Sequence, residues 1–577
     1  MRKFTADFET TTKAEDCRVW AWAICEIGEP DNFIFGNDME TFMEWCSERC
    51  HNYQLYFHNL KFDGSYIISW LLQNDFTWVE NKKDRKDNTF TTLITDLGQY
   101  YSITVYFRVR KNYVSKIEFR DSLKILNFSV EKIAKDFNLP IQKLVIDYKA
   151  ERPIGHKLTE QEIAYIRNDV EIMSRALDIM FKQNLIKMTI GSDALADFKE
   201  RVSNFKHYFP VLPLEIDNDI RKSYKGGFTY LNPIYAGLEI GKGYVLDKNS
   251  MYPSKLVNES LPIGDPIFFD GQYAEDPLYP LYIQRLTCIF QLKKGKIPSI
   301  QLKNNMSFKA NEYLESSNGD LVTLTLCSPD LELFFKNYDV SELHFQGGWK
   351  FKSIKGLFAD YVNHWTEQKI QAKKDGNGAL YAISKLLLNS LYGKFGTNPA
   401  SRTKFPYLDE NKILRFGLNQ LETRDPIYLP VASFVTAYAR KDIIESSEKI
   451  REYSLKKYGY DAYIYSDTDS IHCLLNEEDL IELSNELDID DYRLGAWKIE
   501  SSFDRAKFIR QKCYIEESNH NLNVTVAGLP KKLGKYISFD NFNVGFTTEG
   551  MDINDHKLSY KQVKGGVLLV ETDFTIK

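Results

Sequence analysis

The sequence lacks the features that mark membrane and exported proteins. It has no uncharged apolar run of about 18 residues, the length that a membrane-spanning helix needs. Its opening residues, MRKFTADFET, contain no apolar core of a signal peptide. Its 8 cysteines form no CxxC pair and no cluster with histidine at zinc-finger spacing. We therefore expect no membrane span and reduced, mostly buried thiols in a cytoplasmic protein.

An excess of positive charge is also missing. The chain has 74 Lys and Arg against 80 Asp and Glu, a net charge of −6. A uniformly basic surface that coats nucleic acid is thereby excluded, so any nucleic acid must lie in local channels. Two stretches are locally basic, and each is either a solvated face or a contact with DNA or nucleotide. They are Arg505, Lys507, Arg510 and Lys512, interleaved with Phe508 and Tyr514, and Lys369, Lys373 and Lys374.

The length of 577 residues predicts two to four domains, because a single core does not grow that large. The first 190 or so residues indicate mixed α/β structure, with strands near Phe4–Phe8 and Gln54–Phe57. A capping box of Thr159 and Glu162 then predicts the start of an amphipathic helix. The aromatic share of 14% is high, which suits either base stacking or core packing.

The string YIYSDTDSIH, residues 463–472, is the most informative segment. Alternation along a strand would place Asp467 and Asp469 on the same face, where they could share a cation. An exposed acidic strand is the alternative. A calcium loop is disfavoured, because His472 stands where such a loop needs glycine.

A second carboxylate follows the predicted strand Tyr244–Leu246, in the turn DKNSMYP at 247–253. If Asp247 faces Asp469, the two can hold a pair of metal ions that activate a 3′-hydroxyl and neutralise pyrophosphate. Without that approach the segment is only a turn.

A helix predicted at 378–392, ending at Gly393, places Lys385, Asn389 and Tyr392 on one face. A cation, an amide and a ring in one line suit a triphosphate and a base. The opposite face, with Ile383, Leu387 and Leu391, should be buried. An amphipathic surface helix is the alternative.

Three N-terminal segments contain further acids. Asp7 and Glu9 share one side of a strand, HNLKFD at 58–63 follows another strand, and Tyr165 and Asp169 stack on the capped helix. Four acids and a tyrosine are what a two-metal hydrolysis requires, since the acids hold the ions and the tyrosine orients the attacking water. Each segment alone is common in proteins of this length.

These segments together carry a resemblance. DKNSMYP, KLLLNSLYG and YSDTDS, in this order, resemble motifs A, B and C of family B DNA polymerases. Lys512-Cys513-Tyr514 is similar to the family's KxY motif, and Thr436 to Arg440 to its Tx₂GR element. The N-terminal acids resemble the ExoI, ExoII and ExoIII motifs of DnaQ-like exonucleases. Along nearly its whole length the chain resembles the protein-primed polymerases of small tailed Bacillus phages.

The resemblance implies a multi-domain α/β (α+β) fold. A DnaQ/RNase H-like exonuclease domain would precede a right-hand polymerase domain of palm, fingers and thumb. The implied boundaries are 1–189 for the exonuclease, 190–258, 357–399 and 423–533 for palm and fingers, 259–356 for a first insertion that binds a terminal protein, 400–422 for a second insertion that supports processivity and strand displacement, and 534–577 for the thumb.

The resemblance also implies site residues. Catalysis would rest on Asp247, Asp467 and Asp469 in one centre, and on Asp7, Glu9, Asp63, Tyr165 and Asp169 in the other. Metal ligands would be Asp7, Glu9, Asp63, Asp169, Asp247, Asp469 and the backbone carbonyl of Lys248. Nucleotide contacts would come from Ser250, Met251, Tyr252, Lys373, Lys385, Asn389 and Tyr392. DNA contacts would come from Thr10, His58, Asn59, Phe62, Ser122, Lys143, Tyr224, Gly226, Gly227, Thr436, Arg440, Lys512 and Tyr514.

The implied activity is template-directed DNA synthesis with 3′–5′ proofreading, which replicates a linear phage genome in the host cytoplasm by protein-primed, strand-displacing synthesis. Two Mg²⁺ ions per site, replaceable by Mn²⁺, are the implied cofactors. The implied partners are primer-template DNA, dNTPs and a terminal protein, with room for a single-stranded DNA-binding protein; a monomer is expected. One departure stands out, because Tyr381 occupies a place where relatives carry a second phosphate-facing lysine.

Two other functions compete with this interpretation. A standalone exonuclease with a structural C-terminal half would leave Asp247 and Asp469 without a role. A non-enzymatic DNA-binding replication factor would tolerate alanine at every acid named above.

Overall fold

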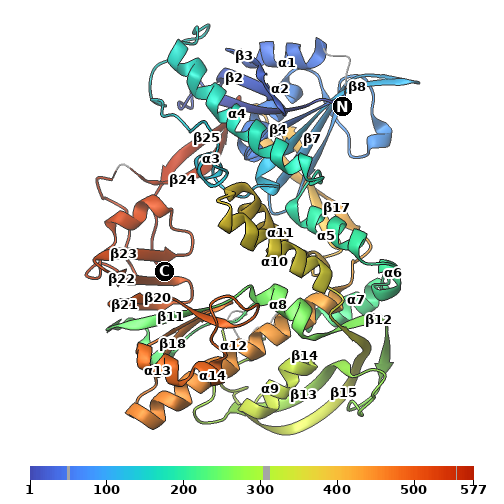
Figure 1. Ribbon diagram of the computed structural model, residues 1–577. Helices are drawn as coiled ribbons and strands as arrows, with labels where there is room; N and C mark the ends of the chain where they lie inside the picture. The colour runs from blue at the N-terminus through green and yellow to red at the C-terminus, as the bar shows by residue number, and fades with distance from the viewer. Residues whose placement is uncertain (49–51, 303–311, 554) are drawn as a thin grey trace.

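The computed structural model describes residues 1–48, 52–302, 312–553 and 555–577. An N-terminal unit lies at the top of Figure 1, two long helices cross the centre with strand β17 to their right, and the other sheets lie below and to the left. A hairpin near the C-terminus reaches back to the N-terminal unit. No helix within these described ranges is long and apolar enough to cross a membrane.

The N-terminal unit is built on an eight-stranded sheet of order β3-β2-β1-β4-β8-β7-β6-β5. The predicted strand near Phe4–Phe8 is β1 (Lys3–Thr10), which pairs parallel with β4 (Tyr53–Phe57) and antiparallel with β2 (Val19–Glu26). The other strands are β3 (Glu29–Gly36), β5 (Thr77–Trp78), β6 (Thr89–Ile94), β7 (Tyr100–Arg110) and β8 (Tyr113–Asp121).

Helix α4 (Glu160–Lys182) lies across β1 and β2. The predicted capping box is present, since the Thr159 hydroxyl accepts from the Glu162 N–H and the Glu162 carboxylate accepts from the Thr159 N–H at 2.9 Å. The apolar side of α4 is buried against the sheet. The remaining helices of the unit are α1 (Met39–Glu48), α2 (Leu60–Gln73) and α3 (Val130–Asp136).

The central helices are α10 (Ala359–Lys374) and α11 (Gly378–Phe395), which pack on α5 (Ile190–Arg201). The predicted helix at 378–392 is confirmed, and Ile383, Leu387 and Leu391 are fully buried. Its predicted end at Gly393 is wrong. The helix continues to Phe395, whose ring packs against Phe209, and Gly396 is the C-cap residue. Shorter helices α6 (Phe205–Tyr208) and α7 (Leu214–Arg221) lie beside them.

Below these helices lies a five-stranded sheet of order β20-β11-β19-β18-β9. Its strands are β9 (Thr229–Leu231), β11 (Gly243–Lys248), β18 (Tyr463–Asp467), β19 (Ser470–Cys473) and β20 (Trp497–Phe503). Helix α8 (Met251–Asn258) follows β11, and the long helix α12 (Leu429–Tyr458) packs against β18, β19 and α8. Helices α13 (Glu477–Glu482) and α14 (Ser484–Leu487) connect β19 to β20.

Three smaller sheets complete the fold. The segment 260–355 forms a sheet of order β12-β15-β13-β14 with helix α9 (Ser328–Asn337). A second sheet has the order β10-β21-β22-β23, and β16 pairs with β17 in a hairpin. The strands are β10 (Glu239–Ile240), β12 (Ser260–Phe269), β13 (Leu281–Leu292), β14 (Val322–Cys327), β15 (Tyr338–Lys355), β16 (Ala400–Leu408), β17 (Leu414–Thr423), β21 (Arg505–Arg510), β22 (Cys513–Ser518) and β23 (Asn521–Val526).

The last hairpin pairs β24 (Lys557–Val563) with β25 (Gly566–Thr572) and docks on α2 of the N-terminal unit. The Tyr66 hydroxyl donates to the Val567 carbonyl at 2.6 Å, and Gly566 packs against the Tyr66 ring. A side chain at Gly566 would overlap that ring, because its Cβ would lie 2.3 Å from Tyr66 Cε1. The C-terminal hairpin therefore closes the molecule onto its N-terminal sheet.

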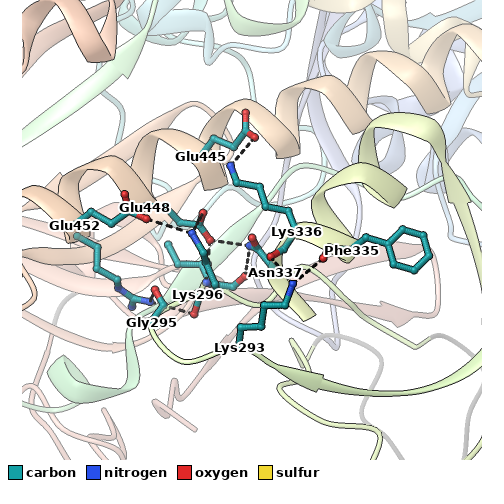
Figure 2. Close-up of polar contacts among 11 residues, drawn as sticks. Lys293, Gly295, Lys296, Phe335, Lys336, Asn337, Glu445, Glu448 and Glu452 are labelled. Carbon is teal, nitrogen blue, oxygen red and sulfur yellow. Dashed lines mark hydrogen bonds and ion pairs between the residues drawn. The ribbon is translucent and has the colours of Figure 1, made fainter. Parts of the chain in front are cut away.

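A buried ion-pair network holds the 260–355 sheet on α12 (Figure 2). Glu448 accepts at 2.7 Å from the side-chain amide of Asn337 and at 3.2 Å from the Ile297 N–H. The Lys296 ammonium lies 3.2 Å from both Glu448 and Glu452. The two carboxylates differ in exposure, since the Glu448 side chain is 4% exposed and that of Glu452 is 66% exposed.

This difference gives a stability prediction. Glu448→Ala should lower the midpoint of thermal unfolding clearly, because it takes the carboxylate from the buried Ile297 N–H and Asn337 amide and removes the buried partner of Lys296, and breaking a buried pair costs about 3–5 kcal/mol. Glu452→Ala removes a carboxylate at the same distance from the same ammonium but should cost less than about 1 kcal/mol. Calorimetry on both variants checks this, and equal losses would contradict it.

Candidate active sites

Two carboxylates lie near each other where the inner strand β11 ends and the inner strand β19 begins, at the strand ends of the five-stranded sheet. This place is called the Asp247 edge below. β11 pairs antiparallel with β19 so that Asp247 lies opposite Ser470, and the Lys248 N–H donates to the Asp469 carbonyl at 2.7 Å. The register of these strands therefore places Asp247 next to Asp469, as the sequence required for a shared metal site.

The expected arrangement of Asp467 and Asp469 on one strand is wrong. β18 ends at Asp467, and Thr468 has a φ of 64°, which reverses the chain into β19. The Thr468 N–H donates to the Phe228 carbonyl at 2.7 Å, and this bond holds the turn. The two acids thus flank a tight turn, with Asp469 beside Asp247 and Asp467 facing Lys512 at 2.6 Å.

The electrostatics of this edge fit divalent cations. The pKa of Asp469 is raised to about 6, mainly by burial and in addition by the charge of Asp247. Two carboxylates this close repel each other. Their oxygens are hard ligands, and a divalent cation bound between them would offset the repulsion. Asp247 and Asp469 are therefore the residues that would hold the ions.

The Lys248 side chain turns away from this edge. Its ammonium donates to Asp442 at 2.9 Å and lies 4.8 Å from the centre of the Trp497 indole, while Lys255 pairs with the same Asp442. Only the main chain of Lys248 faces the acids, so its predicted metal contact through the carbonyl stays a prediction.

The expected nucleotide contacts surround the same edge. The Tyr252 and Tyr392 rings are stacked with centroids 4.1 Å apart, which joins the end of motif A to α11. Ser250 has a φ of 50° and accepts at 3.3 Å from Lys369, and Met251 is buried. On α11 and α10 the side chains of Lys385, Asn389 and Lys373 are exposed.

The expected DNA contacts near the palm divide into two groups. Thr436 and Arg440 are buried in α12, where Thr436 donates to the Ala432 carbonyl at 3.0 Å. Arg440 pairs with Asp330 and donates to the carbonyls of Lys225 and Gly226 at 2.9 and 2.8 Å. It thus holds the loop that contains Tyr224, Gly226 and Gly227, whose DNA contacts stay predictions.

Lys512 and Tyr514, the other group, lie in the sheet of β21 to β23. The Lys512 ammonium donates to Asp467, and the backbone N–H of Lys512 donates to the Tyr465 hydroxyl at 3.0 Å. Tyr514 stacks on Phe508 with centroids 4.9 Å apart. An exposed lysine therefore adjoins the carboxylates beside a partly exposed tyrosine that packs on the buried Phe508, and the contact of Lys512 and Tyr514 with DNA stays a prediction.

A second carboxylate centre lies in the N-terminal unit. Asp7, Glu9 and Asp169 each offer an oxygen within 4.8 Å of the others. The pKa of Asp7 is raised to about 7, mainly by burial and in addition by the charge of Asp169. Burial also raises the pKa of Glu9 and of Asp63, and the Asp7 charge adds to both.

Two oxygens of this centre support the same fit to metal ions. Among the described residues, Asp63 Oδ1 and Asp169 Oδ1 are buried and have no hydrogen-bond partner. Buried polar atoms are ordinarily satisfied, so these oxygens lack the partner that a divalent cation would supply. The four predicted acids are brought together, and they would hold the ions.

A lysine and a tyrosine border the N-terminal acids as predicted. The Lys143 ammonium pairs with Asp169 and lies 5.4 Å from the centre of the Tyr165 ring. Tyr165 is buried, and its hydroxyl is 2.7 Å from that of Tyr148. Thr10 lines an adjoining cavity of about 340 Å³ with Tyr148 and Arg152.

The remaining expected contacts lie at the start of α2. The two ring nitrogens of His58 lie 3.0 Å from the Ser122 hydroxyl and 2.6 Å from the Phe128 carbonyl. His58 and Ser122 therefore connect the start of α2 to the segment that follows β8. Asn59 has a φ of 82° and donates to the Tyr560 hydroxyl at 2.8 Å. The Phe62 ring lies 6.4 Å from that of Tyr560.

Comparison with known proteins gives a consistent result. The profile of the family described as DNA polymerase type B, organellar and viral, matches residues 47–156 and 146–484. The DNA polymerase of Bacillus phage Nf is 44% identical over 100% of both chains, and that of Streptococcus phage Cp-1 is 33% identical over 100% of this chain and 98% of its own. This chain is a family B DNA polymerase.

A solved structure agrees with the fold of this family B polymerase. Phi29 DNA polymerase complexed with primer-template DNA and incoming nucleotide is 42% identical, matches with a TM-score of 0.91 and covers 100% of both chains. The expected multi-domain fold, with an N-terminal exonuclease-type domain before the polymerase domain, is thereby confirmed.

Sequence reasoning missed three residues that border the sites of this polymerase. Tyr148 contacts Tyr165, Tyr560 contacts Asn59, and Lys498 pairs with Asp247 at 2.9 Å. An aromatic residue near Lys143 was a weak signal for Tyr148. The other two contacts join segments that are remote in the chain, and no local pattern marks them.

Gly227 offers a test of the polymerase site. A Cβ at this position would lie 2.8 Å from the Tyr252 hydroxyl and 2.9 Å from Thr468 Cγ2, between motif A and the turn of Asp469. Gly227→Ala should therefore displace these groups and lower nucleotide incorporation roughly 10- to 100-fold, the scale for small misplacements at a reacting centre.

Gly226→Ala is the matched control, because its Cβ would meet no atom within 4 Å. It should lower incorporation far less in the same steady-state assay of primer extension. An equal loss in both variants would mean that backbone freedom, and not the contact with Tyr252, is what Gly227 provides.

Proposed function

We propose that this DNA polymerase also carries 3′–5′ proofreading exonuclease activity and replicates a linear phage genome by protein-primed, strand-displacing synthesis. The observation that carries the proposal is the presence of two separate clusters of carboxylates, a partly buried one around Asp247 and Asp469 and a more deeply buried one around Asp7, Glu9 and Asp169. Since the relatives are phage proteins, the host cytoplasm is the proposed place of action.

Synthesis would take place at the Asp247 edge. Asp247 and Asp469 would hold two Mg²⁺ ions, or Mn²⁺ in their place, which supply Lewis acidity for attack by the primer 3′-hydroxyl and for pyrophosphate release. Lys373 and Lys385 would bind phosphate oxygens, and Asn389 and Tyr392 would contact the nucleotide. The Tyr252 ring, held by its stack on Tyr392, would pack under the deoxyribose and exclude a 2′-hydroxyl.

Asp467 and Lys512 would act together beside this edge. Their pairing at 2.6 Å holds a cation next to the primer side of the site. Tyr514, stacked on Phe508, would support the primer strand.

Hydrolysis would take place at the N-terminal centre. Asp7, Glu9, Asp63 and Asp169 would hold the ions that activate water, and Tyr165 would orient that water. Lys143 would lie next to the scissile phosphate, while Asn59 and Phe62 would bind the single strand. Removal of mispaired ends at this second site multiplies the limited selectivity of base pairing.

The proposed domain boundaries follow the sequence. Residues 1–189 form the exonuclease domain, 190–258, 357–399 and 423–533 the palm and fingers, and 534–577 the thumb. The insertion 259–356 would bind the terminal protein, and the β16–β17 hairpin at 400–422 would support processivity and strand displacement. The first insertion is anchored on α12 through Glu448, so a protein bound there would have a fixed position relative to the palm.

Alanine variants separate the two activities. Asp247→Ala or Asp469→Ala should lower nucleotide incorporation by at least ~10²–10³-fold while single-strand degradation persists, because one electrostatic stabiliser is lost. Asp7→Ala combined with Glu9→Ala should abolish degradation and spare extension. Both activities are measured on a labelled primer, with and without template.

Other outcomes would favour the competing functions. Loss of both activities in either variant would indicate misfolding or one shared site. Extension that survives Asp247→Ala and Asp469→Ala would remove the synthetic role of this edge. Degradation that survives the double variant would remove proofreading from the N-terminal centre.

Protein priming has its own test. Incubation with a candidate terminal protein, Mg²⁺ and one labelled dNTP should label that protein covalently. An absence of labelling in a preparation that extends a DNA primer normally would count against protein priming with that candidate.

A further inference from the structure

Lys498 lies directly across the sheet from Asp247. β20 pairs antiparallel with β11, and these two residues are opposite one another in the register. The ammonium lies 2.9 Å from Asp247 Oδ1, and the two side chains are 32% and 21% exposed. The carboxylate expected to bind metal therefore has an internal cation as its present partner.

The same ammonium belongs to a cluster of lysines on three elements. Lys369 of α10 donates to Ser250, the N-cap residue of α8, three residues after Asp247. Burial lowers the pKa of Lys369, and neighbouring ammonium groups lower it further; these belong to Lys385, Lys498 and Lys373. A cluster of cations around a half-exposed edge suits an anion that carries several negative charges.

Stability does not explain why a lysine is placed here. A partly exposed ion pair contributes at most about 1 kcal/mol. Meanwhile Lys498 competes with metal ions for Asp247, a cost to any site that uses this carboxylate. This cost is offset if the Lys498 ammonium gains a new anionic partner when metal ions bind Asp247.

The position of Tyr381 indicates which anion this is. Tyr381 lies on α11 one turn before Lys385, where the resemblance implies a lysine that faces the triphosphate, and it is close enough to Lys498 to contribute to the raised pKa of that ammonium. The cation that α11 lacks at Tyr381 is thus present on the opposite side of the edge, on β20.

We propose that Lys498 binds a phosphate oxygen of the incoming dNTP, moving to it from Asp247 when metal ions occupy that carboxylate. Lys498 thereby replaces the lysine that α11 lacks at Tyr381. The proposal rests on the proposed role of Asp247 as a metal ligand.

The first test measures nucleotide binding without turnover. A complex with a dideoxy-terminated primer and template is titrated with the next dNTP in Ca²⁺, and Lys498→Ala should weaken dNTP binding about 10- to 100-fold, the scale of one hydrogen bond to a charged group. In turnover the KM for dNTP should rise by a similar factor with little change in kcat. Lys498→Arg should recover part of the affinity.

The second test moves the cation back to α11. Tyr381→Lys in the Lys498→Ala background should restore most of the dNTP affinity, whereas Tyr381→Phe in that background should not. Lys182→Ala is the control, since it removes a Lys–Asp pair of 2.6 Å at the far end of α4. Unchanged dNTP affinity in Lys498→Ala, or equal restoration by Tyr381→Phe, would overturn the proposal.

A third measurement identifies competition for the carboxylate. Binding of Mn²⁺ in the absence of nucleotide, followed by electron paramagnetic resonance, should become tighter in Lys498→Ala, opposite in sign to the effect on dNTP. A merely structural ion pair would weaken both, and that result would overturn the proposal. Asp247→Ala tests the parent assignment separately, because its full activity would refute the metal site whatever Lys498 does.

Discussion

Repulsion between carboxylates that lie side by side, partly or fully buried, is the constraint on which both carboxylate centres depend. In the N-terminal centre, Asp7, Glu9 and Asp169 bring oxygens within 4.8 Å of one another, and burial raises the pKa of each acid. Such groups do not hold themselves together, so the scaffold must supply the energy. It does so with backbone pairing: β1 is bonded on both sides, and α4 is fixed by a complete capping box.

The same constraint explains why lysines stand at the edges of both sites. Lys143 pairs with Asp169, Lys498 with Asp247 and Lys512 with Asp467. Each ammonium offsets part of the repulsion. Lys143 and Lys498 each contact one oxygen of their carboxylate, whereas Lys512 contacts both oxygens of Asp467. A partly exposed lysine on a flexible stem is displaced from a carboxylate at small cost when a metal ion binds.

The sequence was sufficient for the parts of this arrangement that local patterns determine. The capping box of Thr159, the buried face of α11 and the strand before Asp247 follow from spacing and residue type, and all are present. The turn between Asp467 and Asp469 was not predicted. Alternation in a sequence does not reveal that Thr468 adopts a left-handed conformation, which here depends on a hydrogen bond to the Phe228 carbonyl.

Contacts between remote segments were beyond sequence reasoning for a related reason. Tyr560 reaches Asn59 because the β24–β25 hairpin docks on α2, and Lys498 faces Asp247 only through the register of β20 on β11. Neither residue has a neighbour in sequence that signals a role. A site at the junction of several elements can receive a cation from any strand or helix beside it. The same place in the site can therefore hold a positive charge in two related proteins although different sequence positions supply it. Tyr381 and Lys498 fit that argument: α11 has a tyrosine at position 381, where the resemblance implies a lysine, and β20 places a lysine beside Asp247.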